Sequence, residues 1–189
     1  MPPEIVTVKD QIIWSYANLA RADAALQEKA LKYKRTHHII RNKTFYGLKS
    51  GSMKIRSLYY DERLKMIFPQ ACCYCGSMEK LSLDHLIPKI RGGVNEADNL
   101  VWSCRCCNSS KQGQDMLEWM NKKEKFPPIL LLRRYLKIIA KYCEDREIMD
   151  MSLEEVKELN LPFCIKNLPT EFPPLTELKL WIYPEENLF

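Results

Sequence analysis

The sequence predicts an α+β protein that is mostly helical, with a compact metal-stapled unit between two helical regions. Apolar residues recur at helical spacing towards both ends, whereas cysteine pairs and short alternating runs fill the segment from about 71 to 111. We therefore expect an N-terminal helical, basic region (1–70), a cysteine-stapled core (71–123) and a C-terminal helical region with an acidic, proline-rich tail (124–189).

The bulk composition is that of a globular protein. The chain has 189 residues, of which 46% are hydrophobic, so disorder of the whole chain is excluded. No run approaches the roughly 20 apolar residues that span a bilayer, and the start lacks a signal segment. We therefore expect a cytoplasmic protein without membrane contact, in which the eight cysteines are thiols, some of them holding a metal.

In the first region, apolar residues at helical spacing predict a long helix from about Asp10 to Lys34. The positions that carry this pattern are Ile12, Tyr16, Leu19, Leu26, Ala30 and Tyr33. Residues 36–54 mix basic, aromatic and Gly/Ser residues, and we interpret them as irregular. A second helix is expected from about Met53 to Phe68, ended by Pro69.

After the cysteine-rich unit, a helix is expected over Met116–Lys122, and Pro127-Pro128 opens a strongly apolar helix that packs in the core. Ser152 and Glu155 form a capping box for a short helix to about Asn160. Five prolines between positions 162 and 184 then predict an extended tail that wraps or docks.

The charges are unevenly distributed. Residues 29–65 hold 11 Lys/Arg against two acidic residues, whereas residues 144–189 hold four Lys/Arg against 11 acidic residues. Both could simply be solvated faces. The basic stretch, with Phe45, Tyr46, Tyr59 and Tyr60 interleaved, is also suited to a nucleic-acid backbone or unpaired bases. The acidic stretch is a poor DNA contact, so we expect self-association there or a protein subunit such as an ATPase.

The cysteines form two Cys-x-x-Cys pairs, which is the usual way to present four thiolates to a structural Zn²⁺. Only the choice of Cys72, Cys75, Cys104 and Cys107 gives both pairs this spacing, although Cys73 and Cys106 are adjacent. Such a saturated site would replace part of a hydrophobic core. The remaining Cys143 and Cys164 are interpreted as buried free thiols. The doublet at 37–38 has no neighbouring carboxylate or thiol and is not predicted to bind metal.

The segment from Cys72 to Lys111 resembles the HNH endonuclease family in its zinc-bound ββα-metal form. The matching positions, in order, are Cys72-x-x-Cys75-Gly76, Asp84-His85-x-x-Pro88, Arg91-Gly92-Gly93, Asn95, Asn99-Leu100 and Cys104-x-x-Cys107-Asn108-x-x-Lys111. The resemblance implies two antiparallel strands, near 81–86 and 99–102, and a helix that begins near 104–108. It also implies a metal-dependent endonuclease that hydrolyses DNA phosphodiester bonds, in restriction or anti-phage defence.

The resemblance assigns roles to individual side chains. His85 would be the general base, a task that suits an imidazole at neutral pH, and Asn99 would orient it. Asp84 and Asn108 would hold one Mg²⁺ or Mn²⁺, since oxygen donors favour hard cations. Four cations beside this site are expected to contact nucleic acid: Lys89, Arg91, Arg105 and Lys111. The alternative is a catalytically inactive zinc-containing module that binds nucleic acid or acts as a scaffold.

Overall fold

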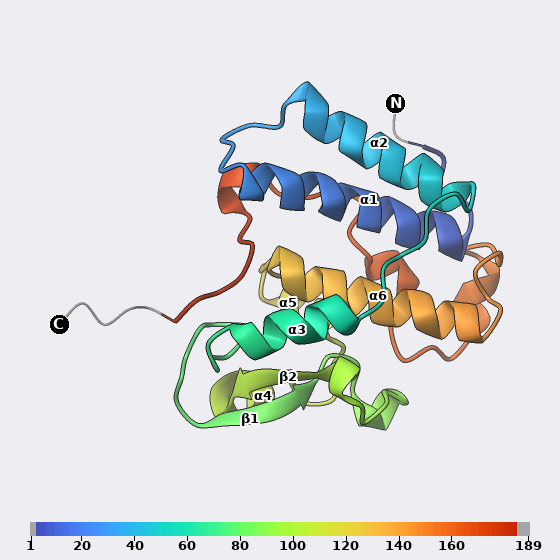
Figure 1. The fold of residues 1–189 in the computed structure, drawn as a ribbon. Coiled ribbons are helices and arrows are strands. Elements are labelled where there is room, and N and C mark those ends of the chain that lie inside the picture. Colours follow the sequence, from blue (N-terminus) through green and yellow to red (C-terminus); the bar gives the residue numbers. More distant parts are fainter. Residues whose placement is uncertain (1–2, 185–189) are drawn as a thin grey trace.

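The computed structural model describes residues 3–184 of the chain, as a two-stranded hairpin packed under a set of helices (Figure 1). The predicted α+β, mostly helical class is confirmed. The helices are α1 (Val8–Gln27), α2 (Arg35–Lys49), α3 (Tyr59–Ile67), α4 (Arg105–Lys111), α5 (Met116–Lys122) and α6 (Ile129–Asp145), and the strands are β1 (Leu81–His85) and β2 (Leu100–Cys104).

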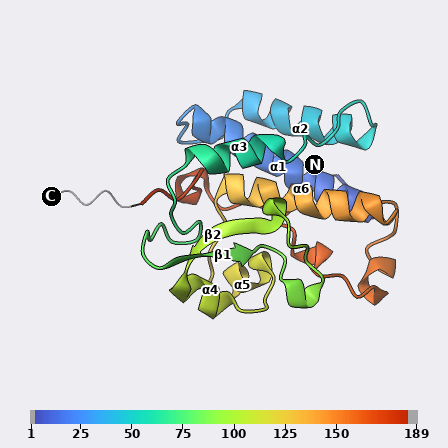
Figure 2. The same ribbon diagram turned by 60° about the horizontal axis from the view of Figure 1, so that its bottom comes forward.

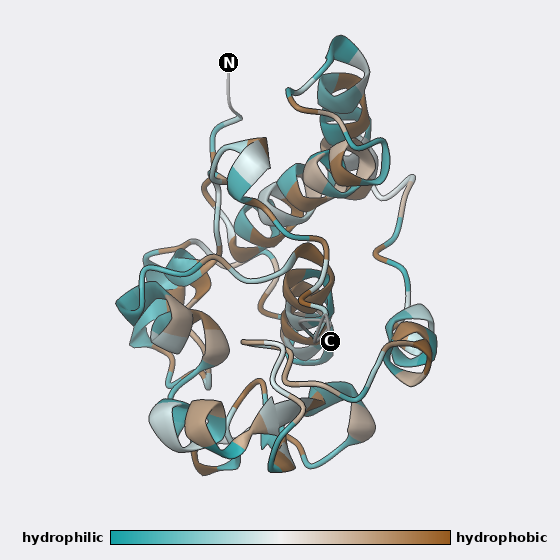
Figure 3. Cartoon of the chain, turned by 90° about the vertical axis from the view of Figure 1, so that its left-hand side faces the viewer, coloured by the Kyte–Doolittle hydropathy of each residue, from teal (hydrophilic) through white to brown (hydrophobic). Residues whose placement is uncertain are grey.

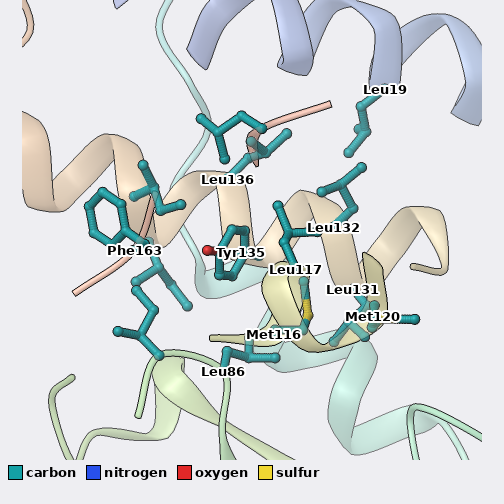
Figure 4. Packing of buried hydrophobic residues seen from close by; sticks show 14 of the residues in the cluster. Leu19, Leu86, Met116, Leu117, Met120, Leu131, Leu132, Tyr135, Leu136 and Phe163 are labelled. Carbon is teal, nitrogen blue, oxygen red and sulfur yellow. The ribbon is translucent and has the colours of Figure 1, made fainter. Parts of the chain in front are cut away.

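The helix α6 forms the centre of the molecule, as Figure 3 shows from the side. It begins directly after Pro127-Pro128, as predicted, and nearly every residue from Ile129 to Ala140 is buried. Figure 4 shows its leucines and Tyr135 in contact range of side chains from α1, α5, the hairpin loop and the C-terminal segment. Residues of all three predicted regions therefore share one hydrophobic core.

The prediction that residues 36–54 are irregular is wrong, because most of them form the helix α2. It packs along α1 through Phe45 and Leu48, whose rings and methyl groups are buried against Trp14. The helix has few apolar positions and a basic composition, so local propensity gave little signal, and packing on α1 decides the structure. The predicted first helix is correspondingly shorter and ends at Gln27 rather than Lys34.

The helix α3 is also shorter than predicted, since it begins at Tyr59 rather than near Met53. Polar contacts hold it to the body of the protein. Asp61 is buried and accepts a 2.8 Å hydrogen bond from Arg133 Nε on α6, and it also pairs with Lys137. At its other end, Lys65 Nζ donates to the carbonyl of Leu100 at 2.9 Å, which ties α3 to β2.

The strands form an antiparallel hairpin in which Asp84 faces Val101 and His85 faces Leu100. Its bounds agree with the prediction to within a few residues, and α4 starts at the expected place. Figure 2 shows α4 and α5 gathered with the hairpin on the side of the molecule opposite to α2. The hairpin therefore packs with α4 and α5, and Met116 and Leu117 of α5 also pack with the leucines of the central α6 (Figure 4).

The C-terminal segment wraps around the helices, as one of the two predicted alternatives stated. Its buried side chains include Phe163, Ile165, Leu168 and Leu175. The carbonyl groups of residues 179 and 180 accept hydrogen bonds from the first turn of α6. The capping box is present, but it starts a 3₁₀ turn over Glu155–Glu158. The last five residues of the predicted acidic tail lie outside the described residues.

None of the described helices has both the length and the apolar composition needed to cross a membrane.

Candidate functional site

The four predicted zinc ligands lie together at the base of the hairpin. Cys72 and Cys75 precede β1, whereas Cys104 ends β2 and Cys107 lies in the first turn of α4. Their sulfur atoms all lie within 4.8 Å of one another. The β2–α4 junction explains part of this convergence, because the Cys104 sulfur accepts a 3.4 Å hydrogen bond from the backbone N–H of Cys107. These cysteines could therefore hold one metal ion.

The geometry of the cluster fits a tetrahedral ion. Sulfurs bound at about 2.3 Å to a tetrahedral zinc lie about 3.8 Å apart, and Cys75 Sγ lies 3.7 Å from Cys104 Sγ. Burial raises the pKa of the Cys107 thiol, and the charge of Cys72 raises it further. Gathering four thiolates at one place is thus unfavourable unless a cation neutralises them.

The other cysteines lie outside this cluster. Cys73 is fully buried, and burial raises the pKa of its thiol well above the ordinary value, so it stays protonated. Cys106 is exposed on α4. Cys143 is a buried free thiol, as predicted, with a pKa raised by burial to about 12. The prediction that Cys164 is buried is wrong, because this residue is exposed in the C-terminal segment. Its neighbours Phe163 and Ile165 are the buried residues there.

Asp84 is buried on the side of β1 that α4 covers, with both carboxylate oxygens engaged. Tyr74 donates a 2.8 Å hydrogen bond from its hydroxyl to Oδ2, and Lys111 Nζ lies 3.2 Å from Oδ1. Burial raises the pKa of Tyr74 well above its usual range, so the phenol remains a donor. Because a carboxylate offers about four lone pairs, these contacts leave acceptor positions for a cation.

Asn108 projects from α4 towards the same side of β1. Its Nδ2 donates to Ser82 Oγ at 3.0 Å and to the Leu83 carbonyl at 3.4 Å. Ser82 and Asp84 share a face of the strand because side chains alternate along it. Asn108 and Asp84 thus lie on one side of the hairpin, with an amide carbonyl and a carboxylate as hard oxygen donors.

His85, the next residue, is half-buried and points to the opposite side of β1. Its Nε2 donates a 2.8 Å hydrogen bond to Oδ1 of Asn95. Because the partner is an amide oxygen, Nε2 is the donor in this contact, and Nδ1 is the ring nitrogen that remains for a water molecule.

Asn99 makes no side-chain contact with His85; it holds the loop between the strands. It is fully buried, its Oδ1 accepts from the N–H of Ile87 at 2.9 Å, and its Nδ2 donates to the carbonyls of Ile87 and Val94 at 2.8 Å each. Its own carbonyl accepts from the backbone N–H of Leu86. Any orienting effect on His85 is therefore exerted through the backbone of this loop.

The same loop needs glycine at two positions. Gly92 has φ of 96°, a left-handed conformation that suits glycine. A Cβ on Gly93 would lie only 1.9 Å from the carbonyl oxygen of Ile87. The close approach of these backbone segments keeps Asn95 beside His85.

The four cations expected at the nucleic-acid surface differ in position. Lys89 and Arg105 are exposed, and Arg91 is exposed but paired with Glu118 at 2.7 Å. Lys111 is fully buried; besides pairing with Asp84 it donates a 2.6 Å hydrogen bond to the carbonyl of His85. A lysine that contacts a DNA phosphate lies at the protein surface. The ammonium of Lys111 is instead buried in the hairpin, where it already pairs with Asp84.

We expect Lys111→Met to destabilise the protein by about 3–5 kcal/mol, because it leaves Asp84 buried without its charged partner. Urea unfolding monitored by circular dichroism measures this loss. Lys122→Met is the matched control, since Lys122 forms an exposed pair with Glu118 and its loss is expected to cost less than about 1 kcal/mol. Equal stability of the two variants would contradict a structural role for the buried pair.

Two residues of the site were missed by sequence reasoning. Asn95 stands within the recognised motif, but nothing in the sequence indicated that it contacts His85. Tyr74 lies between the cysteines of the first pair, and only the folded chain brings its hydroxyl to Asp84. Both ring nitrogens of the buried His37 are engaged, since one accepts from the N–H of Lys34 and the other donates to Glu28, whereas His38 is exposed.

Comparison with known proteins agrees with the resemblance. A family model described as HNH endonuclease matches residues 72–120, about a quarter of the chain. The match includes the hairpin, α4, most of α5 and all four clustered cysteines. No curated protein and no solved structure gives a match to the chain. Residues 72–120 are therefore similar to an HNH endonuclease domain.

Proposed function

We propose that this protein is a metal-dependent endonuclease that hydrolyses phosphodiester bonds of DNA. The observation that carries the proposal is the arrangement of three side chains on the hairpin. Asp84 and Asn108 present oxygen donors on one side of β1, and His85, the residue after Asp84, presents its imidazole on the other side. The family match of residues 72–120 supports the same reaction class. Hydrolysis of a phosphodiester requires an activated water and stabilisation of the charge that develops on the phosphate.

In this proposal His85 is the general base. Its Nδ1 takes the proton from the attacking water, while Asn95 holds the proton on Nε2 and fixes the plane of the ring. Asn99 acts at a distance as a positioning residue, because its three hydrogen bonds hold the loop that carries Asn95. The substrate phosphate would lie at the end of β1, where both sides of the strand can be reached.

Asp84 and Asn108 would hold a Mg²⁺ or Mn²⁺ ion, which suits their oxygen donors. Such an ion acts as a Lewis acid that stabilises charge on the phosphate and on the departing 3′ oxygen. Tyr74 and Lys111 contribute by fixing the Asp84 carboxylate from the side of the protein interior.

The four clustered cysteines would hold a structural Zn²⁺. Four sulfurs saturate a tetrahedral ion and leave no position for water or substrate, so this ion would take no part in the reaction. Its effect is on folding, because the cluster joins the segment before β1 to the junction of β2 and α4.

A cleavage assay with supercoiled plasmid tests the proposed activity. We expect nicked or linear plasmid when Mg²⁺ or Mn²⁺ is added, and intact plasmid without added divalent ion. Asn108→Ala is expected to need a higher Mn²⁺ concentration for the same rate, because it removes one oxygen ligand and keeps the buried pair of Asp84 and Lys111. Plasmid that stays intact with both ions, while the protein still binds DNA, would favour the inactive binding module over the nuclease.

We further propose a role in restriction or anti-phage defence, which rests on the settings known for the family.

We also propose a protein contact through the acidic C-terminal region. The wrapped segment is part of the core, so its deletion would unfold the protein instead of testing a partner. Exposed acidic residues remain available for reversal to lysine, namely Glu154, Glu158 and Glu177. Light scattering should then show loss of self-association, or a pull-down loss of an ATPase subunit; no change in either would contradict the contact.

A further inference from the structure

The helix α3 has its charged and apolar sides reversed relative to an ordinary surface helix. Its acidic residues face the protein: Asp61 pairs with Arg133 and Lys137, and Glu62 pairs with Arg134, all on α6. Four of its five large apolar residues face solvent instead. The exposed fractions are 74% for Tyr59, 51% for Tyr60, 84% for Met66 and 68% for Ile67. A surface helix normally buries such residues, and exposed apolar groups of this size mark an interaction site.

The outer face of α3 carries an exposed cation of its own, and a second lies just before the helix. Asp61 and Glu62 are the acidic residues of the segment 29–65, and α6 engages both of them. Arg63 is exposed on the same face and Arg56 just before the helix, whereas Asp98 and Glu144 line the hollow beside Tyr59. The two exposed arginines favour a polyanion as the partner of this face.

The aromatic residues indicate which polyanion. A tyrosine ring offers a flat face on which a nucleobase stacks, and such stacking is independent of sequence. The ring of Tyr60 is supported by Arg133, whose guanidinium carbon lies 5.3 Å from the ring centroid, and about half of the residue remains open to solvent. The bases of a duplex are stacked on each other, so only an unpaired strand can use these rings.

The position of α3 connects this face with the proposed catalytic residues. Lys65 Nζ donates to the carbonyl groups of Ala97 and Leu100, at 3.2 and 2.9 Å. Leu100 is the cross-strand partner of His85. Figure 1 shows α3 beside β2, so a strand held along α3 would continue onto the hairpin next to His85.

From these contacts we infer that the outer face of α3, formed by Tyr59, Tyr60, Arg63, Met66 and Ile67, binds unpaired nucleotides next to the cleavage site. The inference rests on the proposed function only in that the bound strand is taken to be the substrate. It specifies the substrate as nucleic acid with an unpaired stretch, whereas a fully paired duplex would not engage the tyrosines.

The test is fluorescence anisotropy with a labelled 20-nucleotide single strand and with the same sequence as a duplex. The buffer contains neither added divalent ion nor chelator, so that binding is measured without cleavage and the cysteine cluster is undisturbed. We expect Tyr59→Ala/Tyr60→Ala to weaken single-strand binding about tenfold or more, and duplex binding less than about twofold. Circular dichroism verifies that the variant is folded.

Tyr46→Ala is the matched comparison. Tyr46 belongs to the same basic, aromatic stretch and is 65% exposed, but it lies on α2, so this variant separates a role of the face of α3 from a role of the whole stretch. It should leave single-strand binding unchanged. Unchanged binding by the α3 double variant would overturn the inference and leave its apolar face to a protein partner. An equal loss with Tyr46→Ala would overturn it as well, because the effect would not belong to α3.

The outcome is separable from that of the proposed function. If the double variant loses single-strand binding and the wild-type protein cleaves no nucleic acid with Mg²⁺ or Mn²⁺, the inferred binding face of α3 is supported and the nuclease proposal fails. If the wild-type protein cleaves DNA and the double variant binds and cleaves as well as the wild type, the nuclease proposal stands and the surface fails.

Discussion

Replacing His85 with alanine is expected to reduce plasmid cleavage by about 10²- to 10⁴-fold, because the water then loses its proton acceptor. The side chain is half-buried, and its hydrogen bond goes to the exposed Asn95, so its removal leaves the core intact. Initial rates of nicking at saturating Mg²⁺ measure the effect. Metal analysis and thermal unfolding of the same preparation should match the wild type.

The control is His38→Ala. His38 is an exposed histidine on α2, and its loss should leave the nicking rate unchanged. Activity of the His85 variant within threefold of the wild type would remove His85 from the reaction. A parallel fall in the rate and in the unfolding temperature would instead assign it a structural role.

The second large effect concerns the cysteine cluster. Cys107→Ser is expected to lose bound zinc and to unfold the hairpin, because structural zinc contributes about 10–16 kcal/mol to the folding of small zinc domains. Cys107 is one of the four converging sulfurs, whereas its neighbour Cys106 is exposed and outside the cluster. Cys106→Ser should therefore keep both zinc and stability.

Zinc content by mass spectrometry and protection of β1 and β2 in hydrogen exchange are the measurements for this pair. One zinc per chain is expected for the wild type and for Cys106→Ser. Equal zinc content in both variants would contradict the assignment of the ligands. Loss of zinc without loss of protection would contradict its structural role.

The hairpin and the cysteine cluster were predictable because their positions follow from spacing. Two short Cys-x-x-Cys gaps, an alternating run and a glycine pair specify a local structure that depends little on the rest of the chain. The buried face of α6 was predictable for a similar reason, since its apolar residues recur at a constant helical spacing.

Features that depend on distant contacts were not predictable in this way. The helix α2 is specified by its packing on α1. Its sequence is basic and has few apolar residues, so the pattern of the sequence does not indicate a helix. Lys111 was expected at the surface, as lysine usually is, but it pairs with Asp84 in the interior. The inward position of Asp61 likewise depends on Arg133 and Lys137, which lie more than 70 residues later.

Anomalous diffraction from a crystal grown with Mn²⁺ tests the central claim most directly. Data at the zinc and manganese edges should place one zinc ion among the four sulfurs and one manganese ion about 2.2 Å from oxygens of Asp84 and Asn108. The Nδ1 atom of His85 should face the substrate side of the manganese ion. Zinc peaks elsewhere, or manganese bound away from Asp84, would contradict the account.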